Sequence, residues 1–388
     1  MGELRVLSAS SDRADLGMLK PVWSALSEAG VGLEVLLTGS HVLDDIAARA
    51  LLPVGVEAHT AGASLGGTSG LRAAKGMAAI AAAAAEHVSR LGPDVVLIAG
   101  DRLDMLPVAT ATMPFNTPLA HLAGGDLTLG AVDDRIRHAL SKLSHLHFTV
   151  TAEAARRLYR MGEEPWRVHV SGAPNLDTLS SAERLDAGRF ASEVGLPSVD
   201  GLRLVTVHPE TNAADPLAPA RAVLTALDEE PAPTLMTASN TDPGGAEITR
   251  MLVEFALGRD WAVFVSSLGA RLYANALRHA RMMVGNSSSG IIEAPLFGLP
   301  VINVGRRQDG RARDGGVRDV PADPHAIAAL LREPPSRGVE GSGAGIYGDG
   351  RAGERIAAVL ATLPERERLL RKDFFEGDAE PYVPWEAM

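Results

Sequence analysis

Short apolar runs alternate with helix-spaced segments along most of the chain. The runs at 4–8, 94–99 and 203–207 are nearly continuous in apolar residues, and each is followed by a polar loop. Behind each loop comes a segment whose apolar residues recur three and four positions apart, which is the spacing of a helix. Repeated strand–loop–helix units with apolar strands are typical of a parallel sheet covered by helices on both faces. The pattern therefore predicts an α/β fold.

The alternation occurs twice along the chain. With 388 residues the chain is long enough for two ordinary domains. We predict two Rossmann-like domains facing a cleft, an N-terminal domain at 1–182 and a C-terminal domain at 183–365. The charged and aromatic tail at 366–388 is expected to pack back on the N-terminal domain.

A small polar loop, Gly285-Asn-Ser-Ser-Ser-Gly290, separates a predicted strand that ends at Val284 from a helix-spaced segment at 291–297. Backbone N–H groups are unpaired at a helix start, and the helix dipole adds partial positive charge there. Serine hydroxyls add further donors, so the loop suits a phosphate or diphosphate. Asn and Ser are equally common at this position as simple N-caps. Taken alone, the loop leaves both interpretations open.

Charged and polar residues recur at or just past the other predicted strand ends. Ligands of open α/β sheets bind where the carboxyl ends of the strands lie. Any one of these residues, taken singly, would be a solvated loop residue, and only their recurrence at one edge indicates a site. The residues are Arg13, His41, Asp101, Arg102, His121 and Asp126.

The segment from Asp133 onward is predicted to be a helix with ionisable groups on one face. Asp134, His138 and Lys142 are four positions apart and therefore neighbours on that face. The acids lie at the helix start, where the dipole favours an ionised carboxylate. The alternative is an amphipathic helix with a charged outer face, although the two histidines His138 and His145 are unusual for a purely solvated face.

The net charge of −11 argues against non-specific binding to nucleic acids or membrane surfaces. Any anionic ligand must then be held by locally placed Arg, Ser, His and backbone amides. There is no cysteine, hence no disulfide and no thiolate metal site. Neither dinucleotide nor P-loop glycine motifs occur, and no HExxH-type spacing indicates zinc, so we expect no cofactor and no metal. The N-terminus lacks a basic segment followed by an apolar one, and we expect a cytoplasmic protein without a signal peptide.

Several motifs occur in an order that resembles the hydrolysing UDP-N-acetylglucosamine 2-epimerases of sialic-acid-type pathways. The resemblance covers roughly residues 4 to 360. It implies a glycosyltransferase-B-like fold, with the active site between two Rossmann-like domains, and a homodimer or homotetramer. The motifs are Gly100-Asp101-Arg102, His121-Leu-Ala-Gly-Gly-Asp126, Asp133-Asp-Arg-Ile-Arg-His138, Val207-His208-Pro209, Gly285-Asn-Ser-Ser-Ser-Gly290 and Tyr347-Gly-Asp-Gly350.

The reaction that this resemblance implies is inversion at carbon 2 of a UDP-sugar with loss of UDP. UDP leaves carbon 1 while a proton leaves carbon 2, and water then adds to the unsaturated glycal to give free N-acetylmannosamine or a relative. The resemblance implies a UDP and substrate site that contains diphosphate contacts, a ribose contact and groups facing the nucleotide-sugar. Its residues would be Arg13, Arg102, His208, Asn240, Ser287, Ser288, Glu293 and Arg307.

Proton transfer near carbons 1 and 2 requires acid–base groups. We expect Asp101 and Asp126 to handle the protons, with Asp134, His138 and His208 in support. The family usually has Glu at the position of Asp126, so this carboxylate would stand back by about 1 Å, a displacement that matters in a positioned site.

The family also often has His where this chain has Ala123, so the identity of the sugar stays open. A 2,4-diacetamido-trideoxy sugar nucleotide is one alternative. A glycosyltransferase of the same fold and a nucleotide-sugar sensor without catalysis are two others. Release of UDP without an acceptor would distinguish the epimerases from both of the last two.

Overall fold

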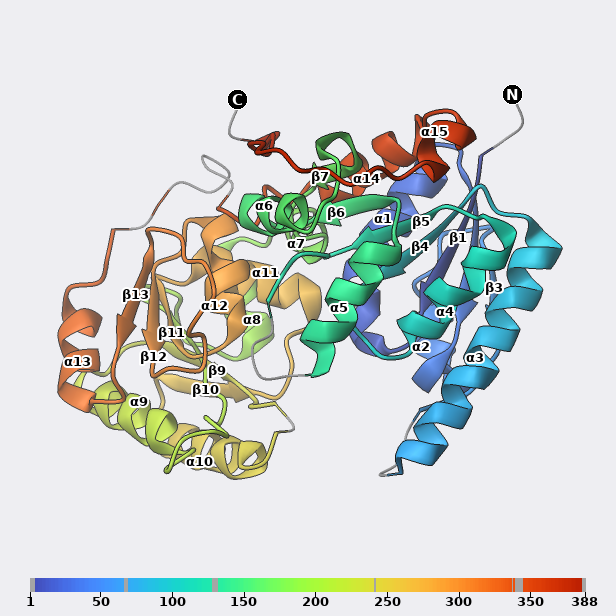
Figure 1. The fold of residues 1–388 in the computed structure, drawn as a ribbon. Helices are drawn as coiled ribbons and strands as arrows, with labels where there is room; N and C mark the ends of the chain where they lie inside the picture. The colour runs from blue at the N-terminus through green and yellow to red at the C-terminus, as the bar shows by residue number, and fades with distance from the viewer. Residues whose placement is uncertain are drawn as a thin grey trace. The chain divides into compact units, whose positions relative to one another are not determined.

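The computed structural model describes residues 4–65, 69–127, 132–240, 242–336, 338 and 345–385, and shows an α/β protein (Figure 1). The chain forms two compact units. The first comprises Met1–Asp177 together with Gly350–Met388, and the second comprises Thr178–Asp349. Each unit is built around one parallel sheet, as the alternating pattern predicts.

The sheet of the first unit has seven strands in the order β3-β2-β1-β4-β5-β6-β7, and every recorded pairing in it is parallel. Strands are added on one side of β1 and then on the other, so the order reverses between β1 and β4. Such a reversal is the place where ligands bind in open α/β sheets. The strands are β1 (Arg5–Ser10), β2 (Gly32–Leu37), β3 (Glu57–Thr60), β4 (Val95–Ala99), β5 (Leu119–Leu122), β6 (Leu146–Thr149) and β7 (Val168–Val170).

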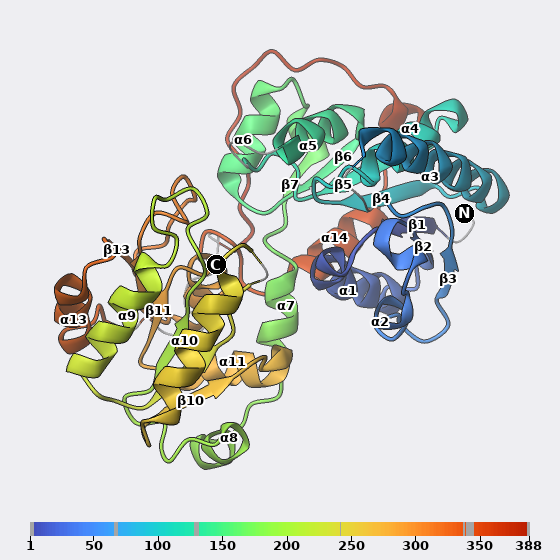
Figure 2. The same cartoon turned by 90° about the horizontal axis from the view of Figure 1, so that it is seen from below.

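Helices cover both faces of this sheet (Figure 2). On one face, α1 (Arg13–Glu28) and α14 (Ala352–Ala361) enclose a core that includes Trp23 and Ile356. On the other face, α3 (Gly70–Leu91) and α4 (Met105–Thr112) bury Ile80 against the sheet. The remaining elements are α2 (Ile46–Arg49), α5 (Val132–Leu143), α6 (Ala152–Arg160), α7 (Asn175–Ser180), α15 (Arg366–Leu370) and three short turns, η1 (Gly39–Val42), η2 (Met113–Phe115) and η3 (Pro165–Arg167).

The sheet of the second unit has six strands in the equivalent order, β10-β9-β8-β11-β12-β13, again with parallel pairings. The reversal lies between β8 and β11. The strands are β8 (Arg203–Thr206), β9 (Thr234–Thr237), β10 (Ala262–Val265), β11 (Met282–Gly285), β12 (Val301–Val304) and β13 (Val317–Val320).

The helices α9, α10 and α13 share one buried core with the second sheet. The buried Asn275 of α11 accepts from Leu185 N at 2.9 Å and so ties α11 to the segment just before α8. The helices are α8 (Ala187–Val194), α9 (Ala218–Glu229), α10 (Gly245–Leu257), α11 (Gly269–His279), α12 (Ser288–Ile292), η4 (Ala294–Phe297) and α13 (Pro324–Arg332).

The second unit begins and ends at other residues than the expected C-terminal domain. Their first division falls at 177/178 instead of 182/183, and residues 350–365 lie with the first unit instead of the second. The physical reason is the packing of α14 on α1. A Cβ placed on Gly353 would come 2.7 Å from Pro21 O, and the backbone N–H groups of Ala352 and Gly353 donate to Asp177 at 2.9 and 2.6 Å.

The tail after α14 contacts the first unit through buried charges. Lys372 donates to the fully buried carboxylate of Glu163 at 2.8 Å, and the buried Arg167 donates to Leu369 O at 2.8 Å. Residues 386–388 of the tail lie outside the described part of the chain. Among the described helices, none has the length and apolar character needed to cross a membrane.

Candidate functional site

The loops after β8 and β11 meet at the carboxyl edge of the second sheet, meaning the edge where its strands end. Asn286 is fully buried there and joins both loops. It accepts from His208 N at 2.7 Å and donates to His208 O at 2.8 Å. Gly285 has a φ of 140°, and a Cβ on it would overlap Thr206 O. These contacts fix both loops where a ligand of an α/β sheet would bind.

The serine loop after β11 leads into a shorter helix than the sequence predicts. The expected helix at 291–297 is replaced by the five-residue α12 and the turn η4. Pro295 provides the reason, since it lacks an N–H and its ring interferes with the preceding turn of a helix. Ser287 caps α12 by accepting from Ser289 N at 3.3 Å, so the capping interpretation is confirmed.

The hydroxyl groups of this loop continue into the side chains around it. Ser289 donates to Glu293 at 2.5 Å and is also bonded to the hydroxyl of Tyr273. A cavity of about 360 Å³ opens beside them at the carboxyl edge of β8, β9, β10 and β11. Seven of its ten lining residues carry a hydroxyl group. The lining residues are Thr206, Thr237, Ser266, Ser267, Leu268, Gly269, Ala270, Tyr273, Ser287 and Ser289.

His208 is held as a neutral imidazole at the end of β8. Its Nδ1 accepts from Asn240 N at 3.0 Å, which leaves the proton on Nε2. Burial, together with the positive charge of Arg307, lowers the pKa of His208 to about 4. His208 therefore offers a hydrogen-bond donor without a charge at neutral pH.

Arg307 follows β12 and points toward the same loops. It donates to Asn286 O at 3.3 Å and lies 3.8 Å from Asp242. Its backbone N–H is held at 3.1 Å by the carboxylate of Glu210, which also accepts from Arg306 N at 2.6 Å. Asn240 is bonded to Asp242 as well, while its Oδ1 is buried without a hydrogen-bond partner. His208, Asn240 and Arg307 thus lie together at this edge of the sheet.

At the carboxyl edge of the first sheet, Asp101 after β4 forms an ion pair with Arg137 of α5. Arg137 is buried, and sequence reasoning had not singled it out. His121, which the sequence placed among the strand-end groups, is fully buried beneath this pair and donates to Gly100 O at 2.7 Å. Burial lowers the pKa of His121 to about 3, so the ring is neutral and supports the loop that carries Asp101.

Arg102 lies between two carboxylates at the same edge. Its guanidinium is 3.7 Å from Asp12 and 3.7 Å from Asp104. Burial raises the pKa of Asp104. Sequence reasoning missed both acids, although Asp104 follows Asp101 by only three positions. Arg13 is 69% exposed and pairs with Asp44 at 2.9 Å.

The other predicted acid–base residues lie on α5 and in the turn before it. His138 Nε2 is 3.7 Å from the Asp134 carboxylate, and both side chains are partly buried. Asp126 is partly buried after β5. Residues 128–131, which complete this predicted motif, lie outside the described residues. The glycine before Asp126 has a packing reason, because Gly125 has a φ of 81° and a Cβ there would overlap Ala154 O.

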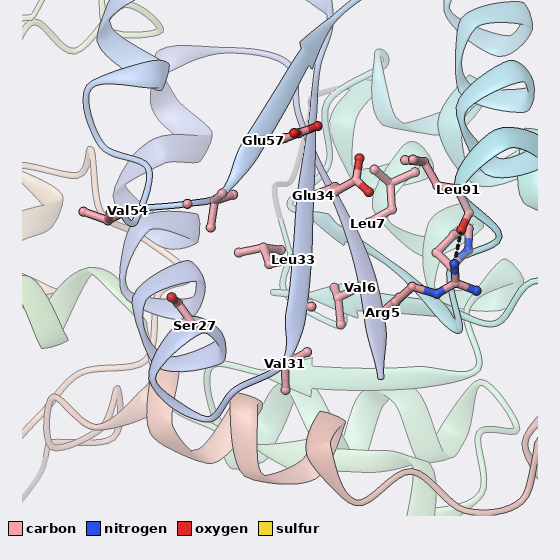
Figure 3. A pocket seen from close by; sticks show the side chains of 14 residues that line it. Arg5, Val6, Leu7, Ser27, Val31, Leu33, Glu34, Val54, Glu57 and Leu91 are labelled. Carbon is pink, nitrogen blue, oxygen red and sulfur yellow. Dashed lines mark hydrogen bonds between the residues drawn. The ribbon is translucent and has the colours of Figure 1, made fainter. Parts of the chain in front are cut away.

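A further hollow of the first unit lies at the opposite, amino-terminal edge of its sheet (Figure 3). Arg5 donates to Leu91 O at 2.8 Å on one side of it, and the carboxylates of Glu34 and Glu57 come from neighbouring strands. Together with His59 they form one group of possible metal ligands whose atoms lie within 4.8 Å of one another. His59 Nε2 is hydrogen-bonded to Glu34 at 2.6 Å. We assign no ion to this group.

The protein has two α/β units with parallel sheets, and polar loops follow the strands at the carboxyl edge of each sheet. This arrangement defines its fold class as glycosyltransferase-B-like. Solved structures agree with that fold. The UDP-GlcNAc 2-epimerase of Methanocaldococcus jannaschii has a TM-score of 0.71 at 16% identity, over 92% of this chain and 99% of that one. That of Neisseria meningitidis, bound to UDP-GlcNAc, has a TM-score of 0.69 at 16% identity, over the same shares.

Sequence comparison is more specific. A family model described as UDP-N-acetylglucosamine 2-epimerase matches residues 24–361, and the chain belongs to that family. The UDP-N,N'-diacetylbacillosamine 2-epimerase (hydrolyzing) of Legionella pneumophila is 31% identical over 95% of this chain and 98% of its own. The UDP-N-acetylglucosamine 2-epimerase of Neisseria meningitidis is 33% identical over 79% and 81%. The protein is therefore an enzyme, a UDP-sugar 2-epimerase.

Proposed function

We propose that the enzyme is hydrolysing and converts a UDP-linked 2-acetamido sugar into the free 2-epimer and UDP. The observation that carries this proposal is the ion pair between Asp101 and Arg137 at the ligand edge of the first sheet. An arginine that is itself buried holds one oxygen of this carboxylate, so the acid is fixed in position before any substrate arrives.

The second unit supplies the nucleotide site in this proposal. Neutral His208, the guanidinium of Arg307 and the hydroxyls of Ser287 and Ser288 are donors for the diphosphate. They stabilise the negative charge that grows on the diphosphate as it leaves carbon 1. Glu293 accepts from the ribose hydroxyls. The nucleoside occupies the hydroxyl-lined cavity beside it, with Asn240 holding the ring of His208.

The first unit supplies the proton transfers. Asp101 and Asp126 are the proton-handling pair, and Asp134 and His138 support them on α5. Arg13 and Arg102 contact the nucleotide-sugar from this side. In the first step a carboxylate takes the proton from carbon 2 while the bond from carbon 1 to the diphosphate breaks. In the second step water adds its hydroxyl to carbon 1 of the glycal and carbon 2 regains a proton.

Two sugars fit the proposal, and the relatives support both. The Legionella relative is named for UDP-N,N'-diacetylbacillosamine and the Neisseria relative for UDP-N-acetylglucosamine. The Legionella relative matches nearly the whole of both chains, so we place the diacetamido sugar first. From the family resemblance we also propose a cytoplasmic homodimer or homotetramer, which light scattering of the purified protein would test.

Proton NMR in deuterated water tests the reaction with each sugar nucleotide separately. The expected result is UDP together with a free 2-epimer that carries deuterium at carbon 2. UDP-N-acetylglucosamine would give N-acetylmannosamine if it is the substrate. Product without deuterium at carbon 2 would contradict elimination and rehydration. No UDP release from either sugar without an acceptor would contradict the hydrolysing function altogether.

A further inference from the structure

A chain of hydrogen bonds runs through the wall of the hydroxyl-lined cavity in the second unit. It links Tyr273 of α11, Ser289 of α12 and Glu293 at the end of α12. A carboxylate can only accept, so the single hydroxyl proton of Ser289 is donated to Glu293. Ser289 must then accept from the hydroxyl of Tyr273. The direction of the chain is therefore Tyr273 to Ser289 to Glu293.

The protonation state of Tyr273 agrees with this direction. Burial raises the pKa of the Tyr273 phenol, and the negative charge of Glu293 contributes to the same shift. The phenol therefore keeps its proton over the whole physiological range. Tyr273 therefore has a proton to donate to Ser289, as the chain of hydrogen bonds requires.

The chain helps to fix the orientation of the Glu293 side chain. A glutamate loses considerable rotamer freedom when it is fixed, and that ordering has to be opposed by contacts. Ser289 holds one carboxylate oxygen of Glu293 from four residues earlier, at 2.5 Å. Ser289 is in turn held by Tyr273 from a different helix. Tyr273 and Ser289 both line the cavity, so the residues that restrain the carboxylate lie beside the proposed nucleoside site.

We propose that Tyr273 is a positioning residue for nucleotide recognition, acting through Ser289 on the carboxylate of Glu293. This rests on the proposed function, in which Glu293 accepts from the ribose hydroxyls. A fixed carboxylate distinguishes a ribose from a 2′-deoxyribose, because only the ribose offers two neighbouring hydroxyls. Tyr273 thereby contributes to the preference for a ribonucleoside diphosphate.

Substitution of Tyr273 by Phe removes the hydroxyl group and keeps the ring. Dissociation constants for UDP and for 2′-deoxy-UDP are measured by titration calorimetry, together with kcat and KM. Loss of the hydrogen bond that Tyr273 donates to Ser289 predicts about fivefold weaker binding of UDP. Binding of 2′-deoxy-UDP should change about twofold or less, and kcat at saturation should stay within about twofold. Equal weakening of both nucleotides, or of neither, would overturn the proposal.

Ser289→Ala breaks the same chain at its middle and guards against a folding defect of the first variant. It should reproduce the selective loss for UDP, and the double variant should lose no more than either single variant, because both remove one pathway. Additive losses would contradict a shared chain. Tyr382→Phe serves as a matched control, since Tyr382 is 72% exposed and lies in the first unit.

Glu293→Gln separates this inference from the proposed function. If this variant still distinguishes UDP from 2′-deoxy-UDP as the wild type does, Glu293 does not read the ribose and both proposals for it fail. If Glu293→Gln loses the distinction while Tyr273→Phe retains it, the ribose contact stands and only the role of Tyr273 fails.

Discussion

The two sheets have the same strand order, but the loops at their carboxyl edges are fixed by different interactions within each unit. In the second unit, buried Asn286 fastens two loops by hydrogen bonds, and His208 is locked as a neutral ring. In the first unit the corresponding loops carry ion pairs, Asp101 with Arg137 and Arg102 near Asp12 and Asp104. The same topology thus presents a hydrogen-bonding edge once and a charged edge once.

This difference teaches how one repeated fold divides two tasks. Fixed donors stabilise a developing negative charge without reorganising, which suits a departing diphosphate. Carboxylates that are already paired and positioned suit proton transfer. The comparison leads us to expect that substitutions in the second unit change binding and that substitutions in the first change turnover.

Asp101→Asn is expected to have the largest effect. It removes a proton acceptor while keeping the size of the side chain, so turnover should fall by about 10³-fold, within the range of general acid–base catalysis. UDP should still bind within about twofold of the wild type. Steady-state kinetics and calorimetry of the same preparation measure both quantities. Turnover near the wild-type rate would remove Asp101 from the reaction.

Asn286→Ala should produce the reverse pattern. It leaves the backbone N–H and C=O of His208 unpaired in a buried place, which costs roughly 2–4 kcal/mol of stability. UDP affinity should fall by about 30-fold because the loops after β8 and β11 are no longer fixed to each other. Urea denaturation and calorimetry report these changes. Asn212→Ala is the control, since Asn212 is an exposed residue of the loop after β8, and an equal loss in that variant would contradict the role of Asn286.

Arg13→Ala tests one of the two contacts to the nucleotide-sugar that we propose for the first unit, the other being Arg102. Its surface pair with Asp44 is worth at most about 1 kcal/mol, so stability should hardly change. KM should rise about tenfold if the guanidinium contacts the substrate. Asp44→Asn is the matched control, because it removes the same ion pair and leaves the guanidinium in place. Similar kinetics in both variants would mean that Arg13 serves only the pair.

Much of the fold could be predicted from periodicity. The apolar run at 94–99 forms the buried strand β4, and the run at 203–207 forms β8. The partner of an amphipathic helix could not be predicted in the same way. A helix pattern shows that one face is buried but not against what, and α14 therefore went to the wrong unit. The prediction of one continuous helix at 291–297 was wrong for a local reason, because the ring of Pro295 interrupts it.

The site was predictable where residues follow strand ends and unpredictable where partners lie far apart in sequence. The serine loop and His208 lie at the expected edge. Arg137 pairs with a residue 36 positions away, and Tyr273 bonds to a residue 16 positions away. No periodicity connects such pairs. His121 shows the opposite limit, because its strand is buried on both faces and the ring turns into the core.

The smallest expected effect concerns acid stability and separates the two units again. Burial lowers the pKa of His169 to about 4 and that of His145 to about 4 in the first unit, in addition to His121 at about 3. In the second unit only His208, among the described residues, has a clearly lowered histidine pKa. A histidine whose pKa is lower when folded binds its proton more readily when unfolded. Its contribution is complete above pH 6.5 and is lost as pH falls toward 4.

His169→Phe removes one such titrating group and keeps an aromatic ring in its place. The ring of His169 stacks on Phe148 with centroids 5.8 Å apart, and phenylalanine can keep this contact. One titrating group changes the slope of stability against pH by at most about 1.4 kcal/mol per unit. Between pH 7 and pH 5 the variant should therefore lose about 1–2 kcal/mol less stability than the wild type. Urea denaturation at the two pH values measures the difference. Equal losses would mean that His169 titrates normally in the folded protein, so that acid sensitivity would depend on the more deeply buried His121.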